Sequence, residues 1–316
     1  MDYKEIIINE LSVLHKKEVA NKQPFKAKAY MTVITNLKKI DHPIYSFDDL
    51  KDVKGIGEKI REKIAEIFST GVCQAAQKAR DDKELSSENI FTGIYGVGPV
   101  KAKELVEIHK LYTIEDLRKK VKNNNEILND KQMIGLSYYE DLKKRIPRSE
   151  MNIHNTMIQT ISKKFKGLTA IIVGSYRRGS SDSGDIDILL TTSDDRNVLS
   201  DFVNELIAID YILETLAEGT KKFMGICRIN GQDTCSRRID ILFTPREEYP
   251  WALLYFTGSQ ELNVQMRSRA LELGYSINEH RAIPVDHDEL PPIMDDEKDI
   301  FDFLGMKYLK PEDRNL

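Results

Sequence analysis

The hydrophobic pattern of the chain changes period at Pro147, and this change constrains the fold more than any other feature. Before it, apolar residues recur every three or four positions, the spacing of an amphipathic helix. After it, short runs rich in β-branched residues predict strands, and helical stretches at about 151–165 and 197–209 lie between them. We therefore expect an α+β chain with a helical first half. The predicted strands are Ala170–Val173, Ile186–Leu190 and Ile239–Phe243.

The charge of the chain is divided between its two halves. The 316 residues suffice for two or three domains, and the net charge is −4. Residues 1–150 contain 28 Lys and Arg against 24 Asp and Glu, whereas residues 151–316 contain 19 against 27. The first half is therefore a candidate for binding an anion, and the second half for holding solvated or metal-binding acids. The spacing of the three cysteines predicts neither a disulfide framework nor a zinc site and favours a reducing compartment.

A short glycine motif occurs twice in the helical half. Val53–Lys59 and Ile94–Lys101 share the order hydrophobic, any residue, Gly, hydrophobic, Gly, and each is expected to start a helix. Such a turn exposes backbone amides where the helix dipole also favours an anion. One copy alone is better explained by a tight turn between helices. Two copies, each followed by a lysine, resemble the helix-hairpin-helix, and this resemblance implies contact with the DNA backbone without reading of bases. A dinucleotide-binding fingerprint is excluded because the third glycine is absent.

Lys59 and Lys63 lie four residues apart after the first motif and so share a helix face. The simplest interpretation is a solvated basic face. The alternative is a partly desolvated lysine whose neutral amine attacks a sugar aldehyde and forms a Schiff base. The residues alone leave both interpretations open.

The segment from Val173 to Leu190 contains the strongest chemical signal. A predicted strand enters a turn rich in Gly, Ser and Arg, and the next strand carries Asp185 and Asp187. These two side chains point to the same side because they are two residues apart. Asp240 is a third carboxylate within a predicted strand. Clustered carboxylates of this kind typically bind Mg²⁺, and three can hold two metals that activate a hydroxyl and stabilise a leaving phosphate.

Several further motifs carry a resemblance to a known family. Ser175 and Arg178 supply a hydroxyl and a planar guanidinium that suit phosphate oxygens. The motifs G-S-Y-R-R-G, S-G-D-I-D, R-R-I-D, L-Y-F-T-G-S and I-N-E follow one another as in the family X DNA polymerases, which the chain resembles over nearly its whole length. The resemblance implies a helical 5′-deoxyribose-phosphate lyase domain at 1–83, a helical DNA-binding subdomain at 84–148, a catalytic palm at 149–245 and a nucleotide-closing subdomain at 246–316.

The resemblance also implies roles for single residues. The expected metal ligands are Asp185, Asp187 and Asp240, and Asp240 also helps to deprotonate the primer 3′-hydroxyl. Lys63 is the expected Schiff-base lysine, supported by Glu62. Contacts to the incoming nucleotide are expected from Arg148, Ser175, Arg178, Ser183, Gly184, Tyr255, Phe256, Gly258 and Asn263. Contacts to DNA are expected from Lys26, Tyr30, Gly55, Gly57, Lys59, Gly96, Gly98, Arg238 and Arg267, of which Arg238 also supports the acidic cluster.

The cofactors and partners implied by the family are equally specific. They are two Mg²⁺ ions, replaceable by Mn²⁺, and a monovalent cation, Na⁺ or K⁺, at the glycine turns. The expected partners are gapped or nicked duplex DNA, deoxynucleoside triphosphates and repair proteins such as a DNA ligase. A monomer without a membrane association is expected, inside the cell, in the nucleus of a eukaryote or in a viral factory or virion.

Six positions depart from the family pattern, among them Phe25, where a histidine is expected, and Ala75, where a lysine is expected. Leu242 stands where an arginine is expected, and Gln260, Val264 and His280 replace an Asp, a Lys and a Tyr. These changes leave the predicted chemistry intact and concern fidelity, the affinity for the phosphate at the gap and the rate of closure.

The predicted function is the filling of short DNA gaps in base excision repair by two-metal nucleotidyl transfer, with a lyase activity and without a proofreading exonuclease. Two alternatives stay open. A terminal transferase or RNA-tailing nucleotidyltransferase of the same fold would extend single-stranded primers. A DNA-binding scaffold would have lost a carboxylate ligand, and the intact carboxylates argue against it.

Overall fold

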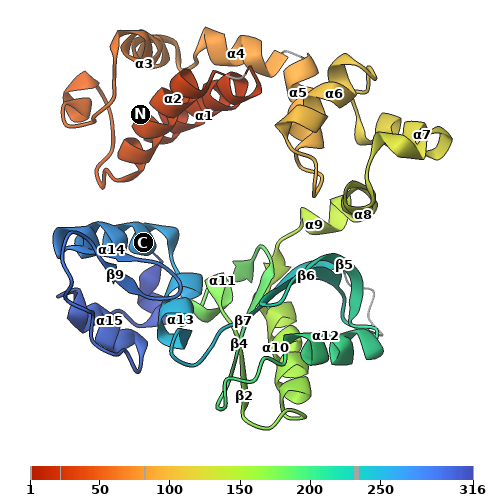
Figure 1. Ribbon diagram of the computed structural model, residues 1–316. Helices are drawn as coiled ribbons and strands as arrows, with labels where there is room; N and C mark the ends of the chain where they lie inside the picture. Colours follow the sequence, from red (N-terminus) through yellow and green to blue (C-terminus); the bar gives the residue numbers. More distant parts are fainter. Residues whose placement is uncertain (1, 22, 82, 231–234, 316) are drawn as a thin grey trace. The chain divides into compact units, whose positions relative to one another are not determined.

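The computed structural model describes residues 2–21, 23–81, 83–230 and 235–315. The chain forms two units, Met1–Ser137 and Tyr138–Leu316, shown in Figure 1. The described part of the first unit is helical, as predicted. Its elements are α1 (Lys4–Ala20), α2 (Pro24–Lys38), η1 (Phe47–Leu50), α3 (Glu58–Thr70), α4 (Gln74–Asp81), α5 (Lys83–Phe91), α6 (Pro99–Glu107), α7 (Ile114–Asn123), η2 (Asn125–Ile127) and α8 (Asp130–Ser137).

An apolar core joins the first four helices of this unit. The members recur at helical spacing in the sequence, so each helix presents one apolar stripe to the others. Glu10 of α1 is buried in the same region, where it accepts a hydrogen bond from the backbone N–H of Cys73 and pairs with Arg80 of α4. This ion pair fastens α4 to α1. The core includes Ile7, Leu11, Val33, Leu37, Ile64, Ile67 and Ala76.

The second unit confirms the predicted mixture of strands and helices. In α10, helical residues begin directly after Pro147, three residues before the predicted start. The elements are α9 (Tyr139–Leu142), β1 (Ile146–Pro147), α10 (Arg148–Ser162), β2 (Leu168–Ile172), α11 (Gly174–Arg177), β3 (Asp182–Ser183), β4 (Ile186–Thr192), α12 (Leu199–Ala208), β5 (Ile212–Glu218), β6 (Lys222–Cys227), β7 (Arg237–Phe243), α13 (Tyr249–Thr257), α14 (Gln260–Glu272), β8 (Tyr275–Ile277), β9 (Ala282–Pro284), α15 (Glu297–Phe303) and η3 (Pro311–Arg314).

A five-stranded mixed sheet is the centre of this unit. Its order is β2-β4-β7-β6-β5, with β4 and β7 parallel and the other neighbours antiparallel. Alternate residues of β4 and β7 pack into a core with α10 and α12, which lie beside the sheet in Figure 1. The residues between them, Leu189 and Leu242, pack with α13 on the other face. Each strand therefore has two differently covered faces, which decides where its polar residues lie.

A smaller α+β subdomain follows the sheet. Helices α13, α14 and α15 and the two-stranded β8–β9 sheet enclose a core of their own, which includes Trp251, Met266, Tyr275 and Phe301. Among the described residues, none of the helices is both long and apolar enough to cross a membrane.

Candidate active site and DNA-binding turns

Asp187 and Asp240 are brought side by side by the parallel strands β4 and β7. The two residues are direct register partners. Ile186, Ile188 and Ile241 belong to the core shared with α10 and α12. Because side chains alternate along a strand, the two carboxylates point to the opposite face. The spacing in the sequence predicted that Asp185 and Asp187 point to the same side. The sheet shows in addition that Asp240 of β7 lies beside Asp187.

The electrostatics of this pair are those of crowded carboxylates. Burial, followed by the charges of Asp185 and Asp240, raises the pKa of Asp187 to about 7. Asp240 is buried, and within the described part of the chain its Oδ1 has no hydrogen-bond partner. The Lys222 Nζ lies 3.4 Å from the other oxygen of Asp240. These carboxylates need more positive charge than one exposed lysine supplies.

Arg238 supplies part of that charge. Its guanidinium forms an ion pair with Asp185, and its Nε lies 3.7 Å from Asp240 Oδ1. Among the residues that the structure describes, no three His, Cys, Asp or Glu side chains converge into a ready-made metal site. The structure therefore brings Asp187 and Asp240 together and turns Asp185 toward Arg238.

The donor set nevertheless fits a hard divalent cation. Oxygen ligands from carboxylates are what Mg²⁺ takes, and a raised pKa beside an unpartnered carboxylate oxygen is typical of a group that shares a cation. Asp187 and Asp240 would hold it, and Asp185 would join when it leaves Arg238.

The glycine-serine turn lies directly against the carboxylates. Gly174 has a φ of +62°, and a Cβ added there would lie 3.1 Å from Asp187 Oδ2, so glycine is required for the close approach. The hydroxyl of Ser175 donates to that of Ser183, at 2.9 Å. The structure thus places both predicted phosphate-binding hydroxyls together.

Arg148 has a bracing position in this structure. Its Nη1 donates to the carbonyls of Tyr176 and Ser180, at 3.0 and 3.1 Å, and its guanidinium lies over the Tyr176 ring. The Arg148 side chain therefore stabilises the glycine-serine turn through its backbone carbonyls. Its predicted contact with a nucleotide phosphate stays a prediction. Gly184, also predicted for the nucleotide, is exposed, and a Cβ there would approach Arg145 to 3.0 Å.

The predicted nucleotide residues of the small subdomain lie together where α13 meets α14. Asn263 donates to the carbonyl of Tyr255 at 2.9 Å, and the Arg267 guanidinium lies over the Tyr255 ring. Phe256 packs edge-on against Tyr255, with ring centroids 5.0 Å apart. Gly258 connects the two helices with a φ of +67°. The structure thus gathers five predicted residues at one turn.

The lysines predicted for the lyase chemistry are less closely gathered. Lys63, half-buried on α3, donates from Nζ to the backbone carbonyl of Lys59 at 3.1 Å. Lys26 is exposed on α2, with its Nζ 3.9 Å from Glu18. Tyr30 is half-buried, and burial raises its pKa. Glu62 is exposed on α3 beside Lys63. Both interpretations of Lys63 remain compatible with this arrangement.

The two glycine turns have nearly the same geometry. Gly55 and Gly96 have φ values of +96° and +82°, and Gly57 and Gly98 are extended N-cap residues of α3 and α6, with φ near −80° in both. Each turn therefore presents its backbone at a helix N-terminus, as the sequence predicted. In the second turn, Gln132 also donates to the carbonyl of Gly96 at 3.0 Å.

Four protein-family models match successive parts of this architecture. A helix-hairpin-helix domain matches residues 5–73, the fingers domain of DNA polymerase lambda residues 89–143, the DNA polymerase beta palm residues 145–246 and the DNA polymerase beta thumb residues 252–315. The chain belongs to the family X DNA polymerases. The resemblance inferred from the motifs is thereby confirmed.

Curated relatives of this family X member cover most of its length. DNA polymerase lambda of Arabidopsis thaliana is 32% identical over 312 residues, covering 91% of this chain and 58% of the relative. DNA polymerase lambda of Rattus norvegicus is 29% identical over 333 residues, covering 99% and 56%. DNA nucleotidylexotransferase of Xenopus laevis is 26% identical over 332 residues, covering 91% and 63%. The chain therefore spans less than two thirds of the length of these relatives.

Sequence reasoning on this family X chain missed three residues at the site. Lys222 of β6 contacts Asp240, and Thr257 and Asn315 contact Arg178. Lys222 could have been found from the sequence, because it is a lysine at the end of a strand next to the strand that carries Asp240. Asn315 had no local signal, because 137 residues separate it from Arg178.

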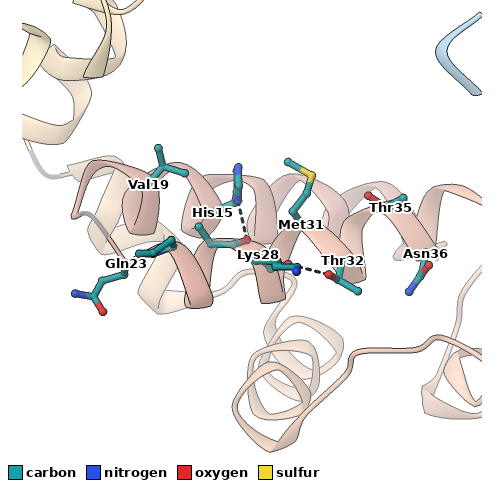
Figure 2. A pocket seen from close by; sticks show the side chains of 10 residues that line it. His15, Val19, Gln23, Lys28, Met31, Thr32, Thr35 and Asn36 are labelled. Atoms are coloured by element: carbon teal, nitrogen blue, oxygen red, sulfur yellow. Dashed lines mark hydrogen bonds between the residues drawn. The ribbon is translucent and has the colours of Figure 1, made fainter. Parts of the chain in front are cut away.

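An open groove of about 650 Å³ lies on the α1–α2 face of the first unit. Figure 2 shows His15, whose ring Nδ1 is 2.9 Å from the carbonyl of Ala27, and the hydroxyl of Thr32, which donates to the carbonyl of Lys28. The residues around it do not include those predicted for the Schiff-base chemistry. We assign no function to this groove.

Proposed function

We propose that the chain is a DNA-directed DNA polymerase that fills short gaps in duplex DNA during base excision repair. The observation that carries the proposal is the pairing of Asp187 with Asp240 on an acidic face of the sheet, directly beside the glycine-serine turn. Acidic side chains that can hold divalent cations next to hydroxyl and guanidinium groups suit a substrate with a triphosphate.

The reaction joins the primer 3′-oxygen to the α-phosphorus of a deoxynucleoside triphosphate. The bond between that phosphorus and the bridging oxygen to the β-phosphate breaks, and pyrophosphate leaves. Two divalent cations, Mg²⁺ or Mn²⁺, would supply activation of the hydroxyl and stabilisation of the leaving group. The primer proton passes to Asp240 Oδ1, a role supported by the burial of this oxygen and by its lack of a hydrogen-bond partner among the described residues.

The other residues of the site bind and orient. Ser175, Ser183 and Arg178 contact the triphosphate, whereas the α13–α14 turn contacts the sugar and base through Tyr255 and Asn263. The two glycine turns hold DNA phosphates through backbone groups and a Na⁺ or K⁺ ion, without reading sequence. Support for this part comes from their matched geometry and from the helix-hairpin-helix match.

The second activity in the proposal is a 5′-deoxyribose-phosphate lyase. The Lys63 amine attacks the sugar aldehyde and forms a Schiff base with loss of water, after which elimination releases the 5′-phosphate end. Borohydride trapping on an incised abasic site tests it. Lys63→Ala should lose most of the trapped product, whereas Lys38→Ala, an exposed lysine of α2, should keep it. Undiminished trapping in Lys63→Ala would exclude Lys63.

Primer extension across substrates tests the polymerase proposal. With Mg²⁺, the chain should extend a primer at a one-nucleotide gap faster than the same primer alone. Equal extension of a single-stranded primer would favour a template-independent transferase, an alternative supported by the similarity to a nucleotidylexotransferase. No extension on either substrate would overturn both.

A further inference from the structure

Two adjacent arginines after the glycine-serine turn have opposite electrostatic surroundings. Arg177 forms a two-bond ion pair with the buried carboxylate of Glu297, at 2.9 and 2.7 Å, and Arg314 adds a second pair to that carboxylate. Arg178, in contrast, has neutral hydrogen-bond acceptors: its Nη1 donates to the carbonyl of Thr257 at 2.6 Å, and its Nε donates to Asn315 Oδ1 at 2.9 Å.

This contrast decides which arginine can bind an anion. A carboxylate partner neutralises a guanidinium, whereas a neutral carbonyl orients it and leaves its charge uncompensated. Arg178 is half-buried, and burial lowers its pKa against the opposing influence of the Glu261 charge. Among the described residues, the side-chain hydrogen bonds of Arg178 go to neutral acceptors and not to a carboxylate. Of its five N–H donors, the hydrogen bonds recorded in the described part of the chain occupy one on Nε and one on Nη1, so both donors of Nη2 stay available.

Asn315 holds both ends of Arg178. While its Oδ1 accepts from the guanidinium, its Nδ2 donates to the backbone carbonyl of Arg178 at 3.0 Å. The same Nδ2 is 3.3 Å from the carbonyl of Glu312, which ties it to η3. A side chain that bonds the backbone and the tip of one residue fixes the direction of that residue more firmly than either bond alone.

Gly258 keeps the space that this arrangement needs. A Cβ added there would lie 3.3 Å from Arg178 Nη1, and its φ of +67° is itself a conformation that favours glycine. Arg178 is therefore held by two segments distant in sequence, the α13–α14 connection and the end of η3.

We propose that Asn315 is a positioning residue for nucleotide binding, which orients the Arg178 guanidinium so that its free Nη2 edge meets the triphosphate. The inference rests on the proposed function, because the ligand is the triphosphate of that reaction. Asn315 itself does not touch the nucleotide. Its effect passes through Arg178.

A double-mutant cycle on nucleotide binding tests the inference. The probe is a deoxynucleoside triphosphate, titrated with Mg²⁺ onto the full chain bound to gapped DNA with a dideoxy-terminated primer, so that no turnover is needed. Asn315→Ala should weaken nucleotide binding roughly five- to tenfold, because an orienting hydrogen bond to a charged group is lost. In an Arg178→Ala background, Asn315→Ala should have no further effect. The affinity of Asn315→Ala for gapped DNA and its Tm should equal those of the parent. The control Lys307→Ala, a change at an exposed position, should also keep both values.

The outcomes separate this inference from the proposed function. Nucleotide binding by Asn315→Ala equal to that of the parent, or a loss that persists in the Arg178→Ala background, would overturn the inference while gap filling by the parent stands. A parent chain that binds the nucleotide and fails to extend a normal primer would overturn the proposed function, and the cycle would still decide the role of Asn315. A parent chain that binds no nucleotide would overturn both.

Discussion

Asp187 of β4 and Asp240 of β7 are register partners on two parallel strands, and both carboxylates point away from the core formed with α10 and α12. A parallel pair places equivalent residues of two distant segments side by side, so two acids that are far apart in sequence share one spot. Burial and crowding then make their charge costly, which is the cost that a bound cation relieves.

Removing one of these charges should stabilise the chain in the absence of metal. Asp187→Asn keeps the size of the side chain and removes like-charge repulsion with Asp185 and Asp240. In EDTA at pH 8, we expect the free energy of unfolding to rise by about 1–2 kcal/mol, while primer extension falls. Urea unfolding followed by the fluorescence of Trp251, the single tryptophan, measures it. An unchanged or lowered stability would contradict the electrostatic account.

The buried His154 should make the second unit sensitive to acid. Its Nδ1 is 2.6 Å from the hydroxyl of Tyr211, its Nε2 is 3.6 Å from Glu150, and Arg237 adds a further positive charge nearby. Burial lowers the pKa of His154 from 6.5 to about 4. Between pH 6.5 and about 4, His154 therefore binds a proton in the unfolded chain but not in the folded chain. The contribution of the neutral His154 to the free energy of unfolding is complete above pH 6.5. It decreases as the pH falls towards 4, by up to about 3 kcal/mol.

His154→Gln tests this acid sensitivity. Other carboxylates also titrate in this range, so the measured quantity is the difference from the parent. The loss of unfolding free energy between pH 6.5 and 4 should be smaller in His154→Gln than in the parent. The control His42→Gln, at an exposed position, should follow the parent. Identical slopes for the parent and His154→Gln would contradict the prediction.

Arg80→Met should destabilise the first unit. It leaves the buried carboxylate of Glu10 without its cation, and among the described residues the backbone N–H of Cys73 is the remaining donor to it. Because the Arg80 side chain is partly exposed, we expect a loss of about 2 kcal/mol, between the values for exposed pairs and for fully buried pairs. Urea unfolding followed by far-ultraviolet circular dichroism measures it. Lys78→Met, an exposed change on the same helix, serves as the control, and equal stability of the two variants would count against the ion pair.

Gly258→Ala should weaken nucleotide binding as well as stability. The added methyl group would lie 3.3 Å from Arg178 Nη1, and the alanine would have to adopt the positive φ of Gly258. Gly71→Ala is the matched control, because Gly71 has a φ of +80° and nothing within 4 Å of an added Cβ. Gly71→Ala should lose roughly 1 kcal/mol of stability through backbone strain, and Gly258→Ala about 1–3 kcal/mol, because a ψ of −157° places Gly258 in a region that essentially only glycine occupies. The affinity for the nucleotide should fall only in Gly258→Ala. Equal nucleotide affinity in the two variants would contradict the proposed contact.

The predictions of strands and turns that the structure confirms came from local sequence patterns. Runs of β-branched residues around Asp187 and Asp240 indicated strands, and the two-residue spacing of Asp185 and Asp187 indicated that their side chains share a side. The glycine turns before α3 and α6 followed from residue type alone. These features depend on neighbours within a few residues, where backbone geometry is set by the sequence itself.

Long-range pairing could not be predicted in the same way. Arg238 could have been expected near the acids, but its pairing with Asp185 rather than equally with all three depends on side-chain directions. Arg148 braces the carbonyl of Tyr176 because α10 begins directly behind the turn. The contact of Asn315 with Arg178 is fixed only by the packing of η3.

The central claim is that Asp240 belongs to the catalytic site of a gap-filling polymerase. Single-turnover extension of a primer at a one-nucleotide gap, with Mg²⁺ and saturating nucleotide, tests it most directly. Asp240→Ala should slow extension by at least roughly a hundredfold, the range lost with a group that moves a proton, while Asp194→Ala, an exposed acid of the same domain, extends like the parent. Extension by Asp240→Ala at the rate of the parent would contradict the account.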